Sequence, residues 1–265
     1  MKDPQNLNLK QIKALLEGFV QKKEYPEKFI LQLKSDERRG VKKLCQNFEH
    51  KKGSLVLKYQ HLEELTNFDR KFLVEVAGID EAGRGPLAGP VVAAAVCLDL
   101  DNLHWALGLD DSKKLKREER KIFYNLIQQN ALSIGIGIIE PLIIDEINIL
   151  QATALAMQKA VQSLSKENLL LLVDGLFVPL LGKNQVATVK GDAKSISIAA
   201  ASIMAKETRD RIMERLDLIY PKYGFASNKG YGTKEHLKNL LEFGPTPVHR
   251  QSFIKNLSAK QGSLF

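Results

Sequence analysis

The stretch of residues 72–98 constrains the fold of this 265-residue chain most strongly. An apolar run, Phe72–Ala77, leads to two adjacent carboxylates, Asp80 and Glu81. A glycine-rich turn with one arginine follows, and then a second apolar run, Val91–Leu98. The pattern predicts a strand, an acidic turn and a second strand. Because neighbouring side chains on a strand point to opposite faces, the two carboxylates can converge on one site only where the strand ends or is distorted.

Two further acids follow strand-like runs. Asp174 ends the apolar run Leu169–Val173, and Asp192 follows residues 185–191 and opens a helix. Sites in open α/β sheets gather at the carboxyl ends of strands, and clustered carboxylates repel one another unless a cation lies between them. Mg²⁺ and Mn²⁺ prefer such oxygen ligands. The pattern predicts a site for two divalent ions, which would activate a water and stabilise the leaving oxygen of a phosphodiester, held by Asp80, Glu81, Asp174 and Asp192.

Each part of this pattern has an alternative interpretation. Asp192 could cap the N-terminus of its helix, and Asp174 could belong to a turn at the end of its strand. The glycine turn could be a nucleotide-binding loop. However, its spacing, Gly83-x-Gly85-x-x-x-Gly89, is not that of a dinucleotide loop, and Pro86 opposes an immediate helix. Its backbone N–H groups, with Arg84, could instead hold a sugar or a phosphate.

Charge and composition favour an intracellular protein with an anionic partner. The chain has a formal charge of +8, and residues 1–73 hold 16 Lys and Arg against 10 Asp and Glu. This surplus favours nucleic acid as the partner, with a solvated surface as the alternative. Cys45 and Cys97 are the only cysteines and resemble small core residues, which fits a reducing compartment. With no signal-peptide core and no long apolar run, we expect a soluble, cytoplasmic protein with no membrane contact.

The pattern of residues 1–70 predicts a module of short helices. Apolar residues recur with helical spacing over 12–19, 41–48 and 55–65. Pro26 could be the first residue of a helix, and Ser35 or Asp36 could cap the one that follows. The module either binds nucleic acid or covers the main domain.

From residue 72 onward, strands and helices alternate. Strands are expected at residues 72–79, 90–98, 132–139, 168–173 and 185–190. Helices are expected at 116–130, 141–164 with a break near Asn148, 193–220 and 233–243. This order predicts an α/β fold with a mixed, helix-covered sheet.

Residues 72–255 resemble ribonuclease HII, with motifs in the order of that family. The matching stretches are Gly78–Val91, Asp111–Leu115, Asn148–Thr153, Val173–Gly175, Lys190–Ser195, Ala199–Lys206, Gly230–Thr233 and His249–Phe253. The resemblance implies a ribonuclease H-like mixed sheet flanked by helices, with an N-terminal helical extension. It divides the chain into a basic helical extension (1–70), a catalytic domain (71–255) and a C-terminal tail (256–265).

The resemblance also implies an activity. Members of this family are metal-dependent endonucleases that cleave the RNA strand of RNA–DNA hybrids. They also incise duplex DNA 5′ to single embedded ribonucleotides, leaving 3′-hydroxyl and 5′-phosphate ends. The chain would then act in ribonucleotide excision and DNA replication, with Mn²⁺ or Mg²⁺. Nothing in the sequence demands more than a monomer.

The family's functional residues fall on identifiable positions. Its metal-binding acids fall on Asp80, Glu81, Asp174 and Asp192, and its ribose 2′-hydroxyl reader falls on Gly83, Arg84, Gly85 and Tyr231. The 2′-hydroxyl is the group that distinguishes RNA from DNA at a given site. Candidate phosphate contacts are Ser112, Lys113, Lys194 and Ser195. Surface solvation is the alternative for the two lysines, and a helix cap or turn for the two serines. His249 and Arg250 are expected to support the fold.

The last five residues form a second candidate site. Gln261-Gly262-Ser263-Leu264-Phe265 resembles the short peptide by which bacterial replication proteins bind the sliding clamp. Leu264 and Phe265 would enter an apolar pocket while Gln261 forms hydrogen bonds, and tethering would raise the local concentration of the nuclease on DNA.

Two other functions compete with this interpretation. A junction resolvase or transposase would also use a carboxylate cluster, but it would leave the Gly83–Gly85 turn and Tyr231 unexplained. A basic hybrid-binding protein with a vestigial site would bind the same nucleic acid without metal-dependent turnover.

Overall fold

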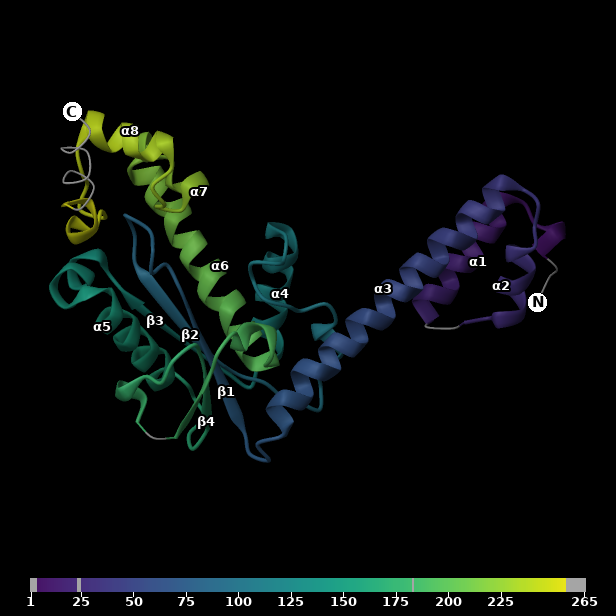
Figure 1. Cartoon of the computed structure of the whole chain (residues 1–265), viewed down its shortest axis with the longest axis horizontal. Coiled ribbons are helices and arrows are strands. Elements are labelled where there is room, and N and C mark those ends of the chain that lie inside the picture. The colour runs from purple at the N-terminus through teal and green to yellow at the C-terminus, as the bar shows by residue number, and fades with distance from the viewer. Residues whose placement is uncertain (1–3, 23–24, 183, 256–265) are drawn as a thin grey trace. The chain divides into compact units, whose positions relative to one another are not determined.

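A computed structural model of the chain describes residues 4–22, 25–182 and 184–255. It divides into two compact units between His61 and Leu62. The first unit contains a short 3₁₀ turn (Pro4–Asn6), α1 (Leu9–Lys22), α2 (Glu27–Lys34) and the first part of α3 (Arg39–Arg70). The second unit contains the sheet and its covering helices (Figure 1).

The first unit has its own apolar core. Two of the predicted stripes, at 12–19 and 41–48, are confirmed apart from Leu15, because their other members are buried or partly buried together with apolar residues of α2, whereas Leu15 is exposed. The core consists of Leu7, Ile12, Leu16, Phe19, Phe29, Ile30, Leu33, Val41, Cys45 and Phe48. Three helices that each offer one apolar stripe can enclose such a core without a sheet.

Three local predictions for this region are wrong. Residues 39–70 form one 32-residue helix, α3, rather than two short ones, since no proline interrupts the segment and isolated glycines are tolerated inside helices. Ser35 is the C-cap of α2. Asp36 accepts hydrogen bonds from the backbone and guanidinium of Arg38, so neither residue caps α3. Pro26 immediately precedes α2 rather than opening it.

The second unit is built on a five-stranded mixed sheet, as predicted. Its strands are β1 (Val76–Ala82), β2 (Val91–Cys97), β3 (Ser133–Ile139), β4 (Leu170–Asp174) and β5 (Gln185–Thr188). They lie in the order β3-β2-β1-β4-β5. The pairs β1–β2 and β2–β3 are antiparallel, whereas β4 runs parallel to β1 and β5 runs parallel to β4.

The first strand differs from its prediction in a way that affects the site. It begins at Val76 rather than residue 72 and runs on to Ala82. Residues 72–75 stay outside the strand, and Leu73 has a positive φ of 57°. Asp80 and Glu81 therefore lie within β1 and not in a turn after it. On a continuous strand they must point to opposite faces.

Helices cover both faces of the sheet (Figure 1). On one face α5 (Pro141–Gln162) packs against Ala93, Ala95 and Cys97 of β2. On the other face α4 (Arg117–Asn130) and α6 (Ile196–Ile219) pack against Ala94 and Val96. The alternating residues of one buried strand thus contribute to two cores.

Close contact of α6 with β1 depends on Gly78. A Cβ atom at this position would lie 2.0 Å from the carbonyl carbon of Ser197. Only glycine lets the start of α6 approach the strand so closely. This approach brings the segment just before α6, which contains Asp192, near the end of β1.

The remaining helices agree with the sequence apart from their ends. The predicted break in α5 is confirmed at Asn148, whose φ is +68°. Residues Gly191–Ala193 form a 3₁₀ turn, so α6 begins at Ile196 and not at 193. Two short helices follow, α7 (Phe225–Asn228) and α8 (Lys234–Phe243). Within the described residues, no helix combines the length and apolar character needed to cross a membrane.

Candidate metal centre

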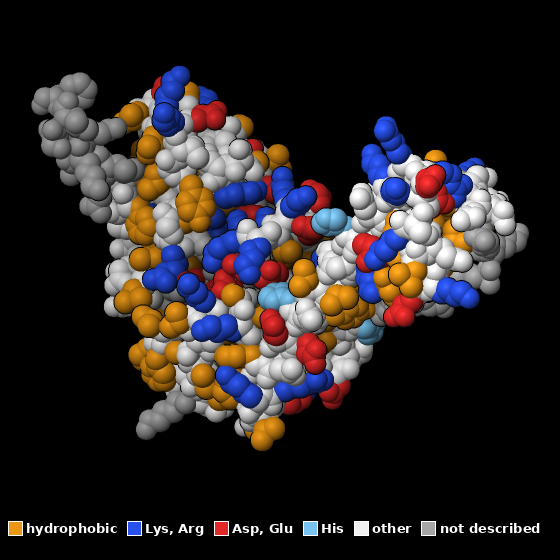
Figure 2. Space-filling view, turned by 45° about the vertical axis from the view of Figure 1, so that its right-hand side comes forward, with side chains coloured by type: hydrophobic (Ala, Val, Ile, Leu, Met, Phe, Trp, Pro, Cys, Tyr) orange, Lys and Arg blue, Asp and Glu red, His pale blue; other side chains and the backbone are white. Residues whose placement is uncertain are grey.

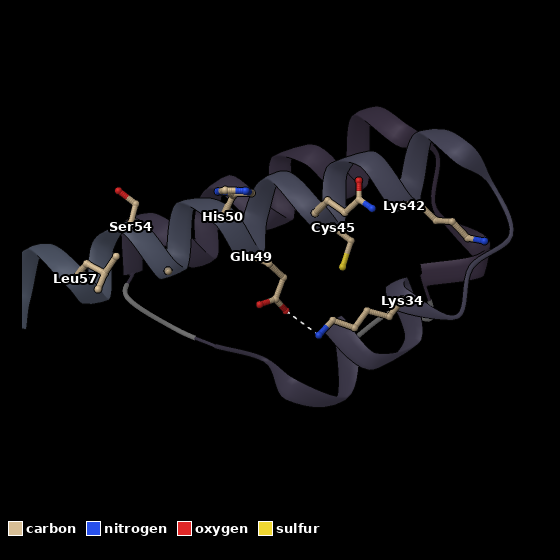
Figure 3. Close-up of a pocket in the computed structure, with 9 residues that line it drawn as sticks. Lys34, Lys42, Cys45, Glu49, His50, Ser54 and Leu57 are labelled. Carbon is tan, nitrogen blue, oxygen red and sulfur yellow. Dashed lines mark ion pairs between the residues drawn. The ribbon is translucent and has the colours of Figure 1, made fainter.

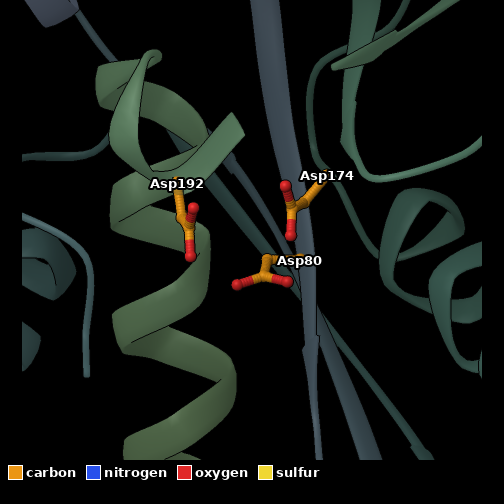
Figure 4. Close-up of side chains that lie close together, drawn as sticks. All are labelled: Asp80, Asp174 and Asp192. Carbon is orange, nitrogen blue, oxygen red and sulfur yellow. The ribbon is translucent and has the colours of Figure 1, made fainter. Parts of the chain in front are cut away.

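Three aspartates meet at the end of the sheet. Asp80, Asp174 and Asp192 each offer a carboxylate oxygen, and these oxygens lie within 4.8 Å of one another. Figure 4 shows the three carboxylates pointing toward a common space. The parallel register pairs Ile79 with Val173, so the residues that follow, Asp80 and Asp174, lie side by side. Asp192 joins them from the turn before α6.

The electrostatics of this cluster favour a bound cation. Asp80 and Asp192 are only 5% and 6% exposed. Burial raises the pKa of Asp80 well above its usual value, and the charges of Glu81 and Asp174 raise it further. Burial also raises the pKa of Asp174. The adjacent Lys113, whose Nζ lies 3.3 Å from Asp192 Oδ2, has a side chain that is 76% exposed. Three oxygen ligands with too little positive charge among them fit a hard divalent ion.

Glu81 occupies a different place from the three aspartates. Because it follows Asp80 on a continuous strand, its side chain leaves from the other face. Its carboxylate pairs with Arg84, with Oε1 and Nη1 3.3 Å apart. Burial raises the pKa of Glu81, while the charge of Arg84 opposes the shift. Glu81 therefore lies at the edge of the site and connects it to the glycine turn.

The four predicted phosphate contacts fall into two classes. Lys113 and Lys194 are exposed. Ser112 and Ser195 are 3% and 0% exposed, and both hydroxyls have internal partners. Ser195 accepts a hydrogen bond from the backbone of Ile198 and caps α6. The helix cap that was the alternative interpretation of Asp192 is therefore provided by Ser195.

Ser112 leads to a residue that the sequence analysis did not single out. Its hydroxyl lies 2.9 Å from that of Ser202 on α6. The Ser202 side chain in turn hydrogen-bonds Asp80 and opposes the rise in the pKa of that carboxyl. A small polar residue ending the run Ala199–Ala201 was the only available signal.

Two buried arginines hold the glycine turn. Arg250, which is 0% exposed, donates to the carbonyl oxygens of Gly83, Arg84 and Gly89. Arg209, which is 1% exposed, donates to those of Ala88, Pro90 and Lys229. Gly83 has a φ of +96°, and a Cβ there would lie 2.1 Å from Nε of Arg209. The turn is therefore fixed from inside the protein, and its outer side remains free to meet a ligand.

Tyr231 lies against the same turn. Its side chain is half exposed, and a Cβ built on Gly85 would lie 3.8 Å from its Cε1 atom. The Leu87 N–H also donates to the carbonyl oxygen of Gly230 at 2.8 Å. The turn after β1 and the residues before α8 thus form one surface. In Figure 2 this unit shows Lys and Arg side chains gathered around acidic ones on the face in view.

A cavity of about 860 Å³ lies elsewhere, in the first unit. Figure 3 shows it between α2 and α3, with Lys34 and Glu49 forming an ion pair across it. Its lining contains one acidic residue and therefore lacks a carboxylate cluster; the lining residues are Lys34, Lys42, Cys45, Gln46, Glu49, His50, Gly53, Ser54 and Leu57.

Comparison with known proteins supplies the family. Residues 77–256 match the family model described as ribonuclease HII. The chain belongs to the ribonuclease HII family. Residues 8–73 match the ribonuclease HII N-terminal domain. The chain is 45% identical to ribonuclease HII of Clostridioides difficile over 257 residues, which cover 96% of this chain and 99% of that one. It is 44% identical to ribonuclease HII of Bacillus subtilis over 251 residues, covering 93% and 97%.

Solved structures agree with the family assignment. Ribonuclease H2 of Pyrococcus horikoshii superposes with a TM-score of 0.57 at 31% identity, covering 67% of this chain and 93% of that one. Ribonuclease HII of Archaeoglobus fulgidus, solved in a complex with PCNA, gives 0.58 at 30% identity, covering 67% and 94%. As a member of this family, the chain is a metal-dependent endonuclease of the class that cleaves RNA in RNA–DNA hybrids. The predicted clamp-binding residues Gln261, Leu264 and Phe265 lie outside the described residues.

Proposed function

We propose that this ribonuclease HII incises duplex DNA 5′ to single embedded ribonucleotides as well as cleaving RNA–DNA hybrids, leaving 3′-hydroxyl and 5′-phosphate ends. The observation that carries the proposal is that β1 leads directly from the aspartate cluster to the glycine turn. Asp80 of β1 belongs to the aspartate cluster, and the turn that follows β1 lies beside Tyr231, with the Leu87 N–H donating to the carbonyl oxygen of Gly230. A sugar read at the turn would place its neighbouring phosphate near the carboxylates.

The residues have distinct roles in this proposal. Asp80, Asp174 and Asp192, with Glu81 at the edge, hold two divalent ions, Mn²⁺ or Mg²⁺. When bound, such ions activate water and stabilise the leaving oxygen of a phosphodiester. Gly83, Arg84 and Gly85 present backbone N–H groups and a guanidinium to the ribose 2′-hydroxyl, while the exposed ring of Tyr231 stacks on the next sugar.

The surrounding residues contribute to binding. Lys113 and Lys194 are exposed and can contact phosphates, whereas the buried Ser112 and Ser195 act within the protein. We assign catalysis to residues 71–255, which hold all the proposed metal ligands. Residues 1–70 form the basic helical extension.

The decisive experiment is cleavage of a DNA duplex that contains one ribonucleotide. We expect incision 5′ to the ribonucleotide with Mn²⁺ or Mg²⁺, and no cleavage in EDTA. Duplexes with 2′-deoxy or 2′-O-methyl sugars at the same position are the controls, because they differ only at the group being read. Equal cleavage of the all-DNA duplex would indicate another class of nuclease, and absence of cleavage by folded protein would favour a hybrid-binding protein.

A second partner is proposed for residues 256–265. The complex of the Archaeoglobus fulgidus relative with PCNA supports a search for a clamp partner here. We propose that Gln261, Leu264 and Phe265 bind the bacterial sliding clamp. Deleting residues 261–265 should abolish clamp binding in a pull-down or calorimetric assay, while cleavage of short duplexes without clamp stays unchanged. Clamp binding that survives the deletion, or that is absent from the intact chain, would contradict the proposal.

A further inference from the structure

Two buried histidines face each other beside the glycine turn. His236, in the first turn of α8, is 0% exposed and His249 is 2% exposed. Their Nε2 atoms lie 3.0 Å apart. The rings of Tyr223 and Phe225 contact both imidazoles, with centroids between 5.0 and 6.3 Å apart. Enclosed in this way, the pair does not face solvent or substrate.

The surrounding hydrogen bonds fix which nitrogen carries each proton. The Thr246 backbone N–H donates to His249 Nδ1 at 3.0 Å, so Nδ1 must be an acceptor. A neutral His249 then carries its proton on Nε2 and donates it to Nε2 of His236. The single N–H of a neutral His236 is therefore at Nδ1, which lies 2.8 Å from the carbonyl oxygen of Tyr231.

Burial of the pair favours neutral rings. Burial lowers the pKa of His249 to about 4, and the neighbouring His236 contributes to that shift. Burial also lowers the pKa of His236. With both rings neutral, only one arrangement of donors and acceptors satisfies the series of hydrogen bonds that runs from Thr246 through His249 and His236 to Tyr231.

Each end of the histidine pair holds one part of the proposed sugar-reading surface. At one end, His236 fixes the main chain of Tyr231. At the other, the segment containing His249 pairs with the last residues of the glycine turn. The Gly89 N–H donates to Val248 and the Arg250 N–H donates to Leu87, both at 2.8 Å.

We propose that the His236–His249 pair is a positioning element that sets Tyr231 against the Gly83–Gly85 turn and thereby determines ribose selectivity. The inference rests on the proposed function of that surface. The buried imidazoles hydrogen-bond to each other, to Thr246 and to Tyr231, so they act through Tyr231 and not as catalytic residues.

The proton order can be tested without any substrate. Long-range ¹H–¹⁵N NMR of the imidazoles should show His236 protonated on Nδ1 and His249 protonated on Nε2. Assignments can be made by comparison with His236→Asn and His249→Gln. Any other pair of tautomers would overturn the proposal, whatever the enzyme cleaves.

A matched pair of substitutions tests selectivity. The amide of asparagine can reach the Nδ1 position and still donate to Tyr231, whereas that of glutamine reaches the Nε2 position and leaves the Tyr231 carbonyl with only the Thr233 N–H as a donor. In kcat/KM for a single-ribonucleotide duplex, His236→Gln should lose at least tenfold and His236→Asn at most threefold. Metal-induced shifts in Tm should persist in both variants.

A double-mutant cycle separates positioning from general support of the fold. In a Tyr231→Ala background, His236→Gln should lower kcat/KM less than twofold, because the side chain that His236 positions is already absent. The same tenfold loss in both backgrounds, or no loss with Tyr231 present, would overturn the inference. If wild-type protein lacked ribose-dependent cleavage, the proposed function would fail separately, and the tautomer measurement would still decide the arrangement.

Discussion

Asp80→Asn should reduce turnover by at least about a thousandfold, equivalent to about 4 kcal/mol of transition-state stabilisation. Asp80 is the most deeply buried of the three clustered aspartates that Figure 4 shows. Asparagine keeps the shape of the side chain but supplies neither the charge nor the second anionic oxygen. Single-turnover cleavage of a duplex with one ribonucleotide, at saturating enzyme, gives the measurement. Asp192→Asn is expected to act in the same way.

Although Asp80→Asn should reduce turnover, it should stabilise the protein when no metal is bound. Because Glu81 and Asp174 repel the Asp80 carboxylate, neutralising it should raise the Tm of the metal-free protein by a few degrees. The further rise in Tm that Mn²⁺ or Mg²⁺ gives to the wild type should disappear. Asp101→Asn is the control, since the side chain of Asp101 is 92% exposed. Near-normal turnover of folded Asp80→Asn protein would rule out the proposed metal centre.

Arg250→Met should destabilise the second unit by at least about 3 kcal/mol, a fall in Tm of roughly 6 °C or more. Methionine fills much of the same space, but the buried carbonyls of Gly83, Arg84 and Gly89 lose the donors that Arg250 provides. Arg250→Lys should fall between methionine and wild type, because one ammonium cannot reproduce the planar fork of a guanidinium. Denaturant unfolding monitored by circular dichroism gives the free energies.

Arg215→Met provides a matched control for the arginine prediction. Arg215 lies on α6 and is exposed, so its replacement should change the free energy of unfolding by no more than about 0.5 kcal/mol. Arg250→Met protein as stable as the wild type would show that the turn does not depend on these hydrogen bonds.

The sequence was most informative where chemistry and strand pattern coincided. Asp80, Asp174 and Asp192 follow or end apolar runs, and the structure brings them together. The sequence pattern did not indicate how many of the four acids would bring their carboxylates together. That number depends on where β1 ends, and the strand continues through Glu81 to Ala82. Strand pairing decides this end, and a one-residue change moves a side chain to the other face.

Supporting residues were harder to find for a different reason. Arg209, His236 and Ser202 are polar residues in helices, and in sequence they look the same as residues on a solvated face. Only tertiary packing reveals that all three are buried. His249 and Arg250 were expected to support the fold. The hydrogen bonds of His249 with Thr246 and His236, and those of Arg250 to the glycine turn, agree with that expectation. The continuity of α3 is not evident in the sequence, because its two apolar stripes fit two short helices as well as one long helix.

The sheet order has a consequence for the timing of folding. The antiparallel strands β1, β2 and β3 are near neighbours in sequence and can pair early, but Val76 of β1 also pairs with Leu170 of β4. Such distant contacts form slowly, because a long loop must close first. Until β4 arrives, one edge of β1 stays unpaired and open to aggregation. A nascent chain released before residue 174 would lack both Asp174 and Asp192, so nuclease competence should appear only once the sheet is complete.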